Sequence, residues 1–381
     1  MLNFRITAQD GAARAARLEL AQITMPTPAF MPVGTAASVK GVLPQQLRET
    51  GATCLLANCY HLMLRPGAQT IAELGGLHRF MGWERLILTD SGGYQVMSLA
   101  KLRRLTDKGV QFQSHIDGSR HCLTPERSVE IQRLLGANIV MVLDECIALP
   151  APKASVTQAM ERSLRWAERS KAAFEAGAGK GAARPLLFGI VQGGTDEALR
   201  LRSARALQQV GFDGYAIGGL AVGEGQAAML RTVRATAPAL PAEQPRYLMG
   251  VGTPDDLVQA VALGVDMFDC VLPTRAGRHG VAYGWFGQFN LRNQRFAADA
   301  QPLDAASPCP ASSQFSRAYL HHLFKAKELL GQVLLSWHNL AFYQELMAAM
   351  RQSIAAQTFD DFVARWKAGD PQRPDPESAQ R

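Results

Sequence analysis

Short apolar runs recur along the chain, spaced by roughly 30 residues and mostly separated by segments with a helical period. Strands of this kind, apolar on both faces and alternating with helices, indicate a parallel sheet. Eight such units over about 240 residues fit a closed (β/α)8 barrel of the TIM type better than an open doubly wound sheet. The runs are Phe30–Val33, Thr53–Ala57, Leu86–Leu88, Ile139–Leu143, Leu186–Val191, Tyr215–Ile217, Tyr247–Val251 and Val265–Val271.

Segments between these runs carry helix-start signals. Thr124-Pro125 places a capping hydroxyl and a proline at the start of an amphipathic segment, and Thr253-Pro254 repeats the arrangement. Residues 153–176 form a longer amphipathic segment. The chain is therefore predicted to be an α/β protein built on a (β/α)8 barrel.

Two hairpins are predicted in addition to the barrel. Asp10-Gly11 separates two short strand-like runs within residues 4–20, which is a typical hairpin signal. Residues 91–123 are too long for a plain βα loop after the third strand, and their second half alternates around Asp117-Gly118. Long loops at a barrel mouth are usually functional.

The pattern changes after residue 280. Residues 281–291 suggest short strands, and helices are expected at 316–330, 339–355 and 358–367. We predict three regions: a catalytic barrel with its N-terminal hairpin at 1–275, a C-terminal α/β subdomain at 276–367, and a disordered tail at 368–381.

The bulk composition narrows the class of protein. The 381 residues are 47% apolar, which allows a large core, and no apolar run is long enough to span a bilayer. The N-terminus has no signal-peptide pattern, so a cytoplasmic protein is expected. A formal charge of +7 favours a polyanionic partner. The six scattered cysteines suggest reduced, buried thiols rather than a disulfide framework.

Polar residues and glycines follow the predicted strands at the point where each strand ends. In a (β/α)8 barrel these ends form the mouth that holds the active site. We therefore expect residues that are far apart in the sequence to converge there. They are Gly34-Thr35, Asn58, Asp90, Asp144, Gln192, Gly218-Gly219, Gly250-Val251-Gly252 and Asp269.

Asp269 interrupts the last apolar run. A buried carboxylate costs free energy unless it is paired or used in chemistry. Pro273 is predicted to end this strand, and Arg275 and Arg278 follow on a predicted glycine-containing loop, an arrangement that suits chemistry beside a phosphate-bearing ligand. From these residues alone, a structural aspartate that caps the next turn or pairs with Arg275 explains the pattern equally well.

Seven segments taken together resemble the bacterial tRNA-guanine transglycosylases. The resemblance implies an enzyme that exchanges the wobble guanine of certain tRNA anticodon loops for 7-aminomethyl-7-deazaguanine, a precursor of queuosine. Two carboxylates suit the breaking of an N-glycosidic bond, which passes through oxocarbenium-like character. The segments are Thr89–Val96, Leu143–Cys146, Phe188–Gly194, Ile217–Glu224, Tyr247–Gly252, Asp266–Arg275 and Ser316–His322.

The resemblance also implies residue roles. Asp269 is implied as the nucleophile of a covalent RNA–enzyme intermediate, and Asp90 as the general acid/base. Arg275 and Arg278 are implied to bind the RNA, whose unpaired loop bases can be splayed out. Residues implied for binding the base are Tyr94, Asp144, Cys146, Gln192, Gly219, Leu220 and Met249.

Each base-binding residue has an implied contact. Asp144 accepts from the N–H edge of the base, while Gln192 and the Gly219 amide bind its carbonyl oxygen. The Leu220 carbonyl accepts the aminomethyl group. Tyr94 and Met249 stack on either side of the ring. Cys146 shapes the pocket, and Asn58 and His61 are candidates for positioning Asp269 or the ribose.

The chain departs from the family at a structural zinc site, which the family builds from Cys-x-Cys-x-x-Cys and a later histidine. Ser307 and Ser312 stand at two of the three cysteine positions, so that only Cys309 and His338 remain. Neutral hydroxyls are poor substitutes for thiolates. We therefore expect no bound zinc and no other cofactor.

Other classes of function stay open at this point. Loss of the zinc ligands is compatible with a non-catalytic RNA-binding paralogue or partner subunit, although both Asp90 and Asp269 are retained. A related base-exchange enzyme acting on DNA is a further alternative, against which Arg275 and Arg278 argue. Queuine itself could be the incoming base, but Cys146 and Val222 match the bacterial-type pocket for its precursor. The resemblance suggests a homodimer, and no membrane partner is expected.

Overall fold

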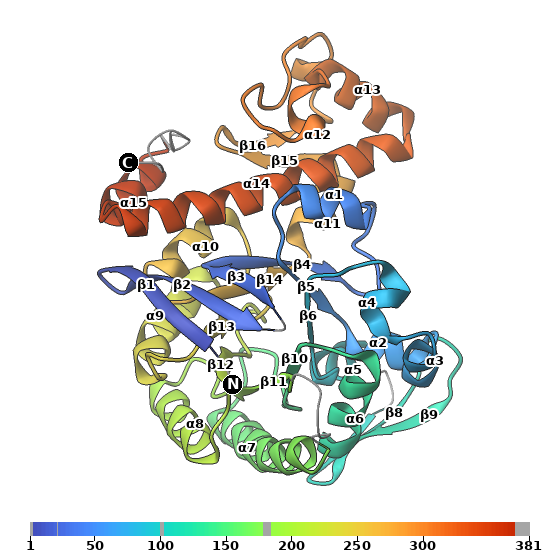
Figure 1. The fold of residues 1–381 in the computed structure, drawn as a ribbon, viewed down its shortest axis with the longest axis vertical. Coiled ribbons are helices and arrows are strands. Elements are labelled where there is room, and N and C mark those ends of the chain that lie inside the picture. The colour runs from blue at the N-terminus through green and yellow to red at the C-terminus, as the bar shows by residue number, and fades with distance from the viewer. Residues whose placement is uncertain (1–2, 21, 100–102, 178–183, 370–381) are drawn as a thin grey trace.

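Eight parallel strands close into a barrel in the computed structural model, which describes residues 3–20, 22–99, 103–177 and 184–369 (Figure 1). Pairing of β14 with β4 and of β10 with β6 completes the ring. The predicted (β/α)8 barrel is confirmed, and every apolar run contributes its strand. The strands are β4 (Ala29–Gly34), β5 (Cys54–Ala57), β6 (Leu86–Thr89), β10 (Ile139–Met141), β11 (Leu186–Val191), β12 (Gly214–Ile217), β13 (Arg246–Leu248) and β14 (Met267–Cys270).

Helices follow the barrel strands and cover the ring. Thr124 and Thr253 cap their helices as predicted, each accepting a hydrogen bond of 3.2 Å from the amide three residues on. The helices are α1 (Pro44–Glu49), α2 (Cys59–Leu64), α3 (Ala68–Glu73), α4 (Gly76–Met81), α5 (Gly93–Leu99), α6 (Pro125–Leu135), α7 (Lys153–Ala176), α8 (Glu197–Val210), α9 (Gln226–Thr236), the 3-10 turn η1 (Ala237–Ala239) and α10 (Pro254–Val261).

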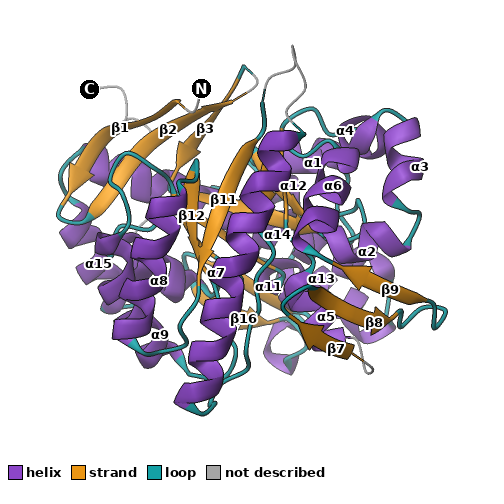
Figure 2. Cartoon of the chain, turned by 90° about the horizontal axis from the view of Figure 1, so that it is seen from below, coloured by secondary structure: helices purple, strands orange, loops and turns teal. Residues whose placement is uncertain are grey.

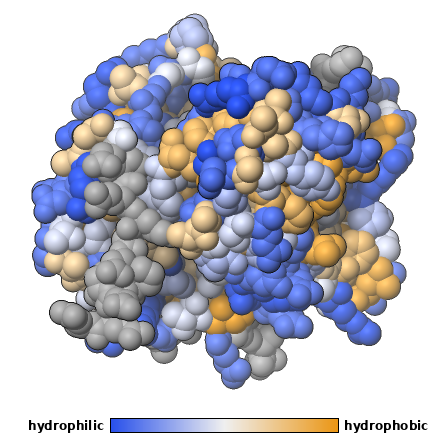
Figure 3. Space-filling model, turned by 90° about the horizontal axis from the view of Figure 1, so that it is seen from above, coloured by the Kyte–Doolittle hydropathy of each residue, from blue (hydrophilic) through white to orange (hydrophobic). Residues whose placement is uncertain are grey.

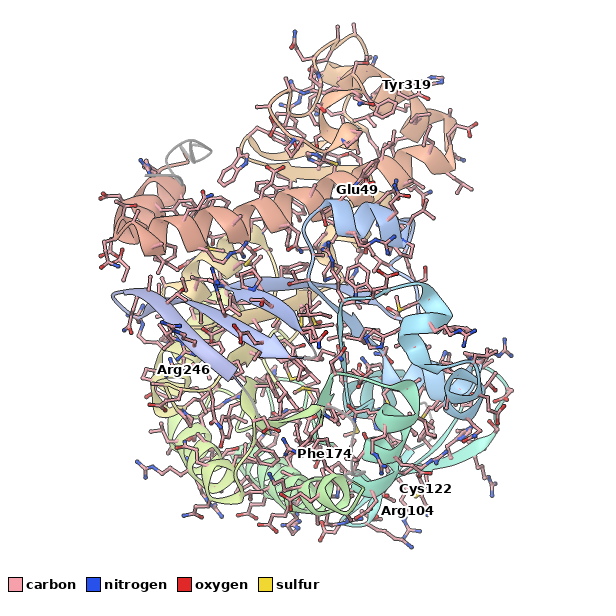
Figure 4. The ribbon with its side chains drawn as sticks, in the orientation of Figure 1. Glu49, Arg104, Cys122, Phe174, Arg246 and Tyr319 are labelled. Carbon is pink, nitrogen blue, oxygen red and sulfur yellow. The ribbon has the colours of Figure 1, made fainter. Side chains whose placement is uncertain are left out.

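A three-stranded antiparallel sheet, β1 (Asn3–Asp10), β2 (Ala13–Leu20) and β3 (Ile23–Thr27), precedes the barrel. It contains the predicted hairpin. Buried Arg14 on β2 donates from Nε to Asp266 Oδ1 over 3.0 Å. Asp266 also accepts from the Arg246 amide over 2.7 Å, and Figure 4 shows Arg246 beside this sheet. The sheet is thus fixed to the start of β14, at the end of the barrel away from the mouth.

The insertion after β6 is a second three-stranded sheet, made of β7 (Arg103–Thr106), β8 (Gly109–Gln113) and β9 (Arg120–Leu123). The predicted hairpin corresponds to β8 and β9, whereas β7 was not foreseen. Figure 2 shows this sheet on the opposite side of the molecule from β1–β3. The expectation that the cysteines are buried is wrong for Cys122, which is exposed on β9, although all six thiols are free.

The region after the barrel contains α11 (Leu272–Arg278), β15 (Val281–Gly284), β16 (Gly287–Asn290), the 3-10 turn η2 (Gln294–Phe296), α12 (Pro310–Ser313), α13 (Arg317–Ala326), α14 (Leu329–Ala355) and α15 (Phe359–Lys367). The strands expected within residues 281–291 are confirmed. The expected helix start at residue 339 is wrong, because α14 is one helix of 27 residues. A nearly continuous apolar stretch lets it run from one hydrophobic core into another.

Helix α14 joins the appendix to the barrel. In Figure 1 it crosses the molecule between the barrel and the group formed by α12, α13, β15 and β16. Its first half packs on a separate apolar core that includes Cys309 and Leu320. In its second half, Tyr343 donates to the Gly252 carbonyl over 2.8 Å and Gln344 to the Phe30 carbonyl over 2.9 Å. This half therefore takes the place of the eighth barrel helix.

Among the described residues, no helix combines the length and apolar character needed to cross a membrane. Most of the tail predicted to be disordered, residues 370–381, lies outside the described residues.

Candidate active site

The strand-end residues converge on one cavity of about 600 Å³ at the mouth of the barrel. Asp90 and Asp269 both lie in its wall. Gln192 does not line the cavity, but its side chain donates to Asp144, which does. Of the residues implied for chemistry or base and RNA binding, those lining the cavity are Asp90, Tyr94, Asp144, Cys146, Gly219, Leu220, Met249, Asp269 and Arg275.

Asp90 follows β6 and is 8% exposed. Its Oδ2 accepts a hydrogen bond of 2.6 Å from the side-chain amide of Asn58, and its Oδ1 accepts one of 2.7 Å from the Cys59 N–H at the start of α2. Burial raises the pKa of Asp90 to about 7, the Cys59 hydrogen bond opposes this, and the charge of Asp269 adds to it. Asn58 was expected to position Asp269 or the ribose, but its side chain holds Asp90 instead. His61 lines the cavity nearby.

Asp269 lies near the end of β14, in an environment different from that of Asp90. Its Oδ1 accepts 2.5 Å from the Tyr247 hydroxyl and 2.8 Å from the Gly250 amide. Burial raises the pKa of Asp269, and these two hydrogen bonds partly oppose the rise. Asp269 is therefore the carboxylate whose charged form receives directed support from a hydroxyl and an amide. The two acids facing one cavity thus differ in what stabilises their charge.

Asp144 and Gln192 form a buried hydrogen-bonded pair. Gln192 Nε2 donates to Asp144 Oδ2 over 2.7 Å. Burial raises the pKa of Asp144 to about 6, with hydrogen bonds from Gln192 and Ser91 opposing the rise. Gly219 packs directly on this pair, since a Cβ there would lie 2.2 Å from Gln192 Oε1, and its φ is +64°. Only glycine satisfies both conditions at this position.

The turn after Gly219 is held by Glu224, which accepts from the Ala221 amide and, over 3.0 Å, from the Val222 amide. Because the peptide unit is planar and trans, the Leu220 carbonyl points away from Glu224. Leu220 and Ala221 both line the cavity. A main-chain acceptor at the cavity wall matches the implied contact with an aminomethyl group.

Three further residues shape the cavity between these polar groups. Tyr94 on α5 is 52% exposed and presents its ring at the opening. Met249 after β13 and Cys146 after β10 are half-buried in the wall. Their placement is compatible with stacking on a planar base and with limiting its size.

The arginines Arg275 and Arg278 are not on a loop, as the sequence suggested, but on α11. Pro273 was taken as a breaker, yet proline fits the first turn of a helix, where its missing N–H costs nothing. Arg275 is exposed and lines the cavity. Arg278 is half-buried, and its Nη1 has no hydrogen-bond partner among the described residues. Arg275 is therefore available to a ligand that extends out of the cavity, whereas the unpaired Nη1 of Arg278 is buried and Arg278 does not line the cavity.

Two contributors were missed from the sequence. Tyr247 was counted only as an apolar strand residue, although its hydroxyl bonds the last strand's carboxylate. A tyrosine buried in β13 needs a partner for its O–H, and the neighbouring strand β14 carries Asp269. The order of the strands in the barrel would therefore have indicated this contact. Glu224 had no signal of its own, because its role depends on the conformation of the turn before it.

The fold and the cavity define an enzyme of glycosidic chemistry: a (β/α)8 barrel with two differently tuned carboxylates at the mouth. A sequence model of the family described as Queuine tRNA-ribosyltransferase matches residues 9–372. A protein of Novosphingobium aromaticivorans named Queuine tRNA-ribosyltransferase is 59% identical over 365 residues, which cover 96% of this chain and 97% of that protein. Proteins of the same name from Sphingopyxis alaskensis (58% identical over 368 residues; 96% and 98% covered) and Brucella suis (57% over 371 residues; 96% and 97%) are similar throughout. The chain belongs to the queuine tRNA-ribosyltransferase family of pentosyltransferases.

The raised pKa of Asp90 predicts a pH-dependent cost to stability. A folded pKa of about 7 against an ordinary 3.8 means that the folded state holds this proton more tightly. The wild type should therefore lose stability relative to Asp90→Asn as pH rises from about 4 through about 7, by about 2 kcal/mol between pH 5 and pH 8. Urea unfolding of both proteins at the two pH values measures the difference.

Asp117→Asn is the matched control, because Asp117 is exposed and its pKa of about 2 leaves it charged at both pH values. Its stability difference from wild type should not change between pH 5 and pH 8. A constant difference for Asp90→Asn as well would show that Asp90 titrates like an ordinary aspartate.

Proposed function

We propose that this protein exchanges the wobble guanine of a tRNA anticodon loop for 7-aminomethyl-7-deazaguanine, through a covalent bond between Asp269 and the ribose. The observation that carries the proposal is the pair of carboxylates facing one cavity, buried Asp90 and half-buried Asp269, with Asp269 held by Tyr247 and Gly250 and Asp90 held by Asn58 and Cys59. The name of these relatives, which refers to ribosyl transfer on tRNA, supports the same reaction.

The first half of the reaction uses the two acids in opposite states. Asp269 attacks the sugar carbon C1′ with a carboxylate oxygen, and the bond from C1′ to guanine breaks. Protonated Asp90 gives its proton to the departing guanine, so that the base leaves neutral. A pKa of about 7 provides both forms of Asp90 near neutral pH.

The second half reverses these roles. Ionised Asp90 takes a proton from the incoming deazaguanine, whose nitrogen attacks C1′ as the bond to Asp269 breaks. Asp269 leaves as a carboxylate that the Tyr247 hydroxyl and the Gly250 amide stabilise. Asp90 regains its proton, and both acids return to their starting states.

Recognition of the base is proposed for the groups around Asp144. Asp144 accepts hydrogen bonds from the N–H edge of the base, and Gln192 and the Gly219 amide donate to the carbonyl oxygen of the base. The Leu220 carbonyl lies on the side where an aminomethyl group would find an acceptor, with Glu224 fixing the turn from behind. Tyr94 and Met249 stack on the ring.

The RNA itself is proposed to lie over α11. Arg275 at the cavity edge supplies an exposed cation next to the scissile bond, and half-buried Arg278 adds positive charge on the same helix. The formal charge of +7 attracts the remaining phosphates. Phosphate contacts of this kind position a nucleic acid without reading its sequence.

A homodimer is proposed on the basis of exposed apolar side chains at one edge. Leu43 is 65% exposed before α1, and Leu329 and Leu330 are 72% and 42% exposed at the start of α14. The loop before α1 approaches this part of α14, since a Cβ on Gly41 would lie 3.8 Å from the Val333 Cα. Seen from above, the surface carries apolar patches among hydrophilic residues (Figure 3). A second copy of the chain is the occupant that the family resemblance favours.

A denaturing gel with a stem-loop RNA containing uridine-guanine-uridine tests the covalent step. The wild type should give a band of protein bound to RNA, because Asp269 remains attached to the ribose until a base returns. Asp269→Asn should lose the band entirely, and Asp117→Asn, an exposed position in a surface turn that does not line the cavity, should keep it.

Absence of both the band and guanine exchange in the folded wild type would contradict the proposal and favour a non-catalytic RNA-binding role. A band with the equivalent DNA but not with RNA would favour the alternative of a DNA-modifying enzyme.

The appendix is proposed to be stable without zinc, because the residues at the family's ligand positions do not fit the metal. Ser312 Oγ lies 2.8 Å from His338 Nδ1, and Ser307 Oγ donates to Glu345 over 2.8 Å. His338 Nε2 lies 2.9 Å from the Tyr283 carbonyl. Hydrogen bonds thus engage both serines and both nitrogens of the histidine, where a tetrahedral site would need thiolate and imidazole donors.

The purified wild type should accordingly contain far less zinc than one ion per chain, and chelator should leave its thermal midpoint unchanged. Ser307→Cys/Ser312→Cys should take up about one zinc ion per chain, since it restores the missing thiolates. Ser307→Cys/Ser313→Cys, with the second thiol displaced by one residue, is the matched control and should not. Near-stoichiometric zinc in the wild type that resists mild chelation would contradict the proposal.

A further inference from the structure

Arg200 on α8 is a cation buried in the wall behind the base-binding residues. It is 0% exposed. Its Nε donates to the Gly194 carbonyl over 2.7 Å, and its Nη1 donates to the carbonyls of Val191 over 2.9 Å and Gly218 over 2.7 Å. Nη2 makes a longer contact of 3.4 Å with the Gly219 carbonyl. All these partners are main-chain oxygens.

These carbonyls belong to the ends of two neighbouring strands. Val191 immediately precedes Gln192 at the end of β11, and Gly218 and Gly219 follow β12. One guanidinium therefore links the two segments that carry the proposed donors to the base carbonyl. The main-chain ladder between β11 and β12 extends as far as the hydrogen bond from the Gly218 amide to the Val191 carbonyl, over 3.1 Å, so the Gly219 amide lies just beyond the sheet.

The contact with Gly218 fixes the direction of the Gly219 amide. In a planar trans peptide the N–H points opposite to the preceding C=O. The Gly218 carbonyl points at Arg200, so the Gly219 N–H points away from it. Gly218 and Gly219 line the cavity, whereas Arg200 lies buried behind them. The amide is therefore directed to the side where the base would bind.

We propose that Arg200 is a positioning residue for base recognition: its guanidinium sets the direction of the Gly219 amide and the placement of Gln192. This inference rests on the proposed function and deepens it. Arg200 does not touch the base. It acts by holding the peptide from behind, so that no reorganisation of the turn is needed when the base enters.

Arginine is suited to this position for two physical reasons. Its planar fork reaches several acceptors at fixed angles, which the single ammonium of lysine cannot reproduce. Burial lowers the pKa of Arg200 to about 10, so the group remains charged at pH 7. The positive charge of Arg200 next to the Gly218 carbonyl also polarises the peptide between Gly218 and Gly219, which makes the Gly219 N–H a stronger donor.

Arg200→Lys tests the proposal, with Arg202→Lys as the matched control on the same helix. Arg202 has a side chain that is 57% exposed and pairs with Glu161 on the surface. Arg200→Lys should raise the KM for the incoming base about tenfold or more, as expected for losing charge-assisted hydrogen bonds. Its KM for the stem-loop RNA should stay within about twofold of wild type. Arg202→Lys should match wild type in both.

An unchanged KM for the base in folded Arg200→Lys, or an equal rise in the KM values for the base and for the RNA, would overturn the inference. If the wild type itself exchanged no guanine, the proposed function would fail instead, so the two failures are distinguishable.

The wild type offers a test that needs no variant. Selective ¹⁵N labelling of arginine should show a slowly exchanging guanidinium signal for Arg200, assigned through contacts with its buried neighbours. Adding guanine should shift this signal, because binding at the Gly219 N–H strengthens the bond from Arg200 to the same peptide. No response of the Arg200 signal to saturating guanine would overturn the inference, whether or not Arg200→Lys folds.

Discussion

Burial of carboxyl groups at the mouth of the barrel is the constraint on which the rest of this structure depends. Removing a carboxylate from water disfavours its charged form, and Asp90, Asp144 and Asp269 are all subject to that cost. The arrangement of their partners then distinguishes the two acids of the reaction. Asp269 receives a hydroxyl and an amide on one oxygen, whereas Asp90 receives one donor on each oxygen and also faces the charge of Asp269, and its pKa is about 7. The proposed division into nucleophile and acid/base follows from this difference.

The surrounding fold supplies those donors from separate strands. The start of α2 presents Asn58 and Cys59 to Asp90, and β13 with its following turn presents Tyr247 and Gly250 to Asp269. Each donor is placed by main-chain geometry rather than by a flexible surface chain. At the other end of the barrel, the buried Arg14–Asp266 contact fixes the start of β14, the strand that carries Asp269.

The sequence was sufficient to predict the barrel and the convergence of Asp90, Asp144 and Asp269, because apolar periodicity and strand ends are local signals. It was insufficient where the outcome depends on contacts between distant segments. Pro273 was taken to end a strand and leave a loop, yet it starts α11. The link from Tyr247 to Asp269 can be expected only once their strands are known to be neighbours. The link from Arg200 to Gly218 joins a helix to the end of a strand, and no spacing along the chain reveals it.

The pH dependence of the two half-reactions tests the central claim most directly. Single-turnover rates of guanine release from the RNA, and of base attack on the isolated covalent adduct, would be measured from pH 5.5 to pH 9. If Asp90 is the acid in one step and the base in the other, release should slow and attack should accelerate as pH rises through about 7. Two profiles that are flat or move in the same direction would contradict the assignment of both roles to Asp90.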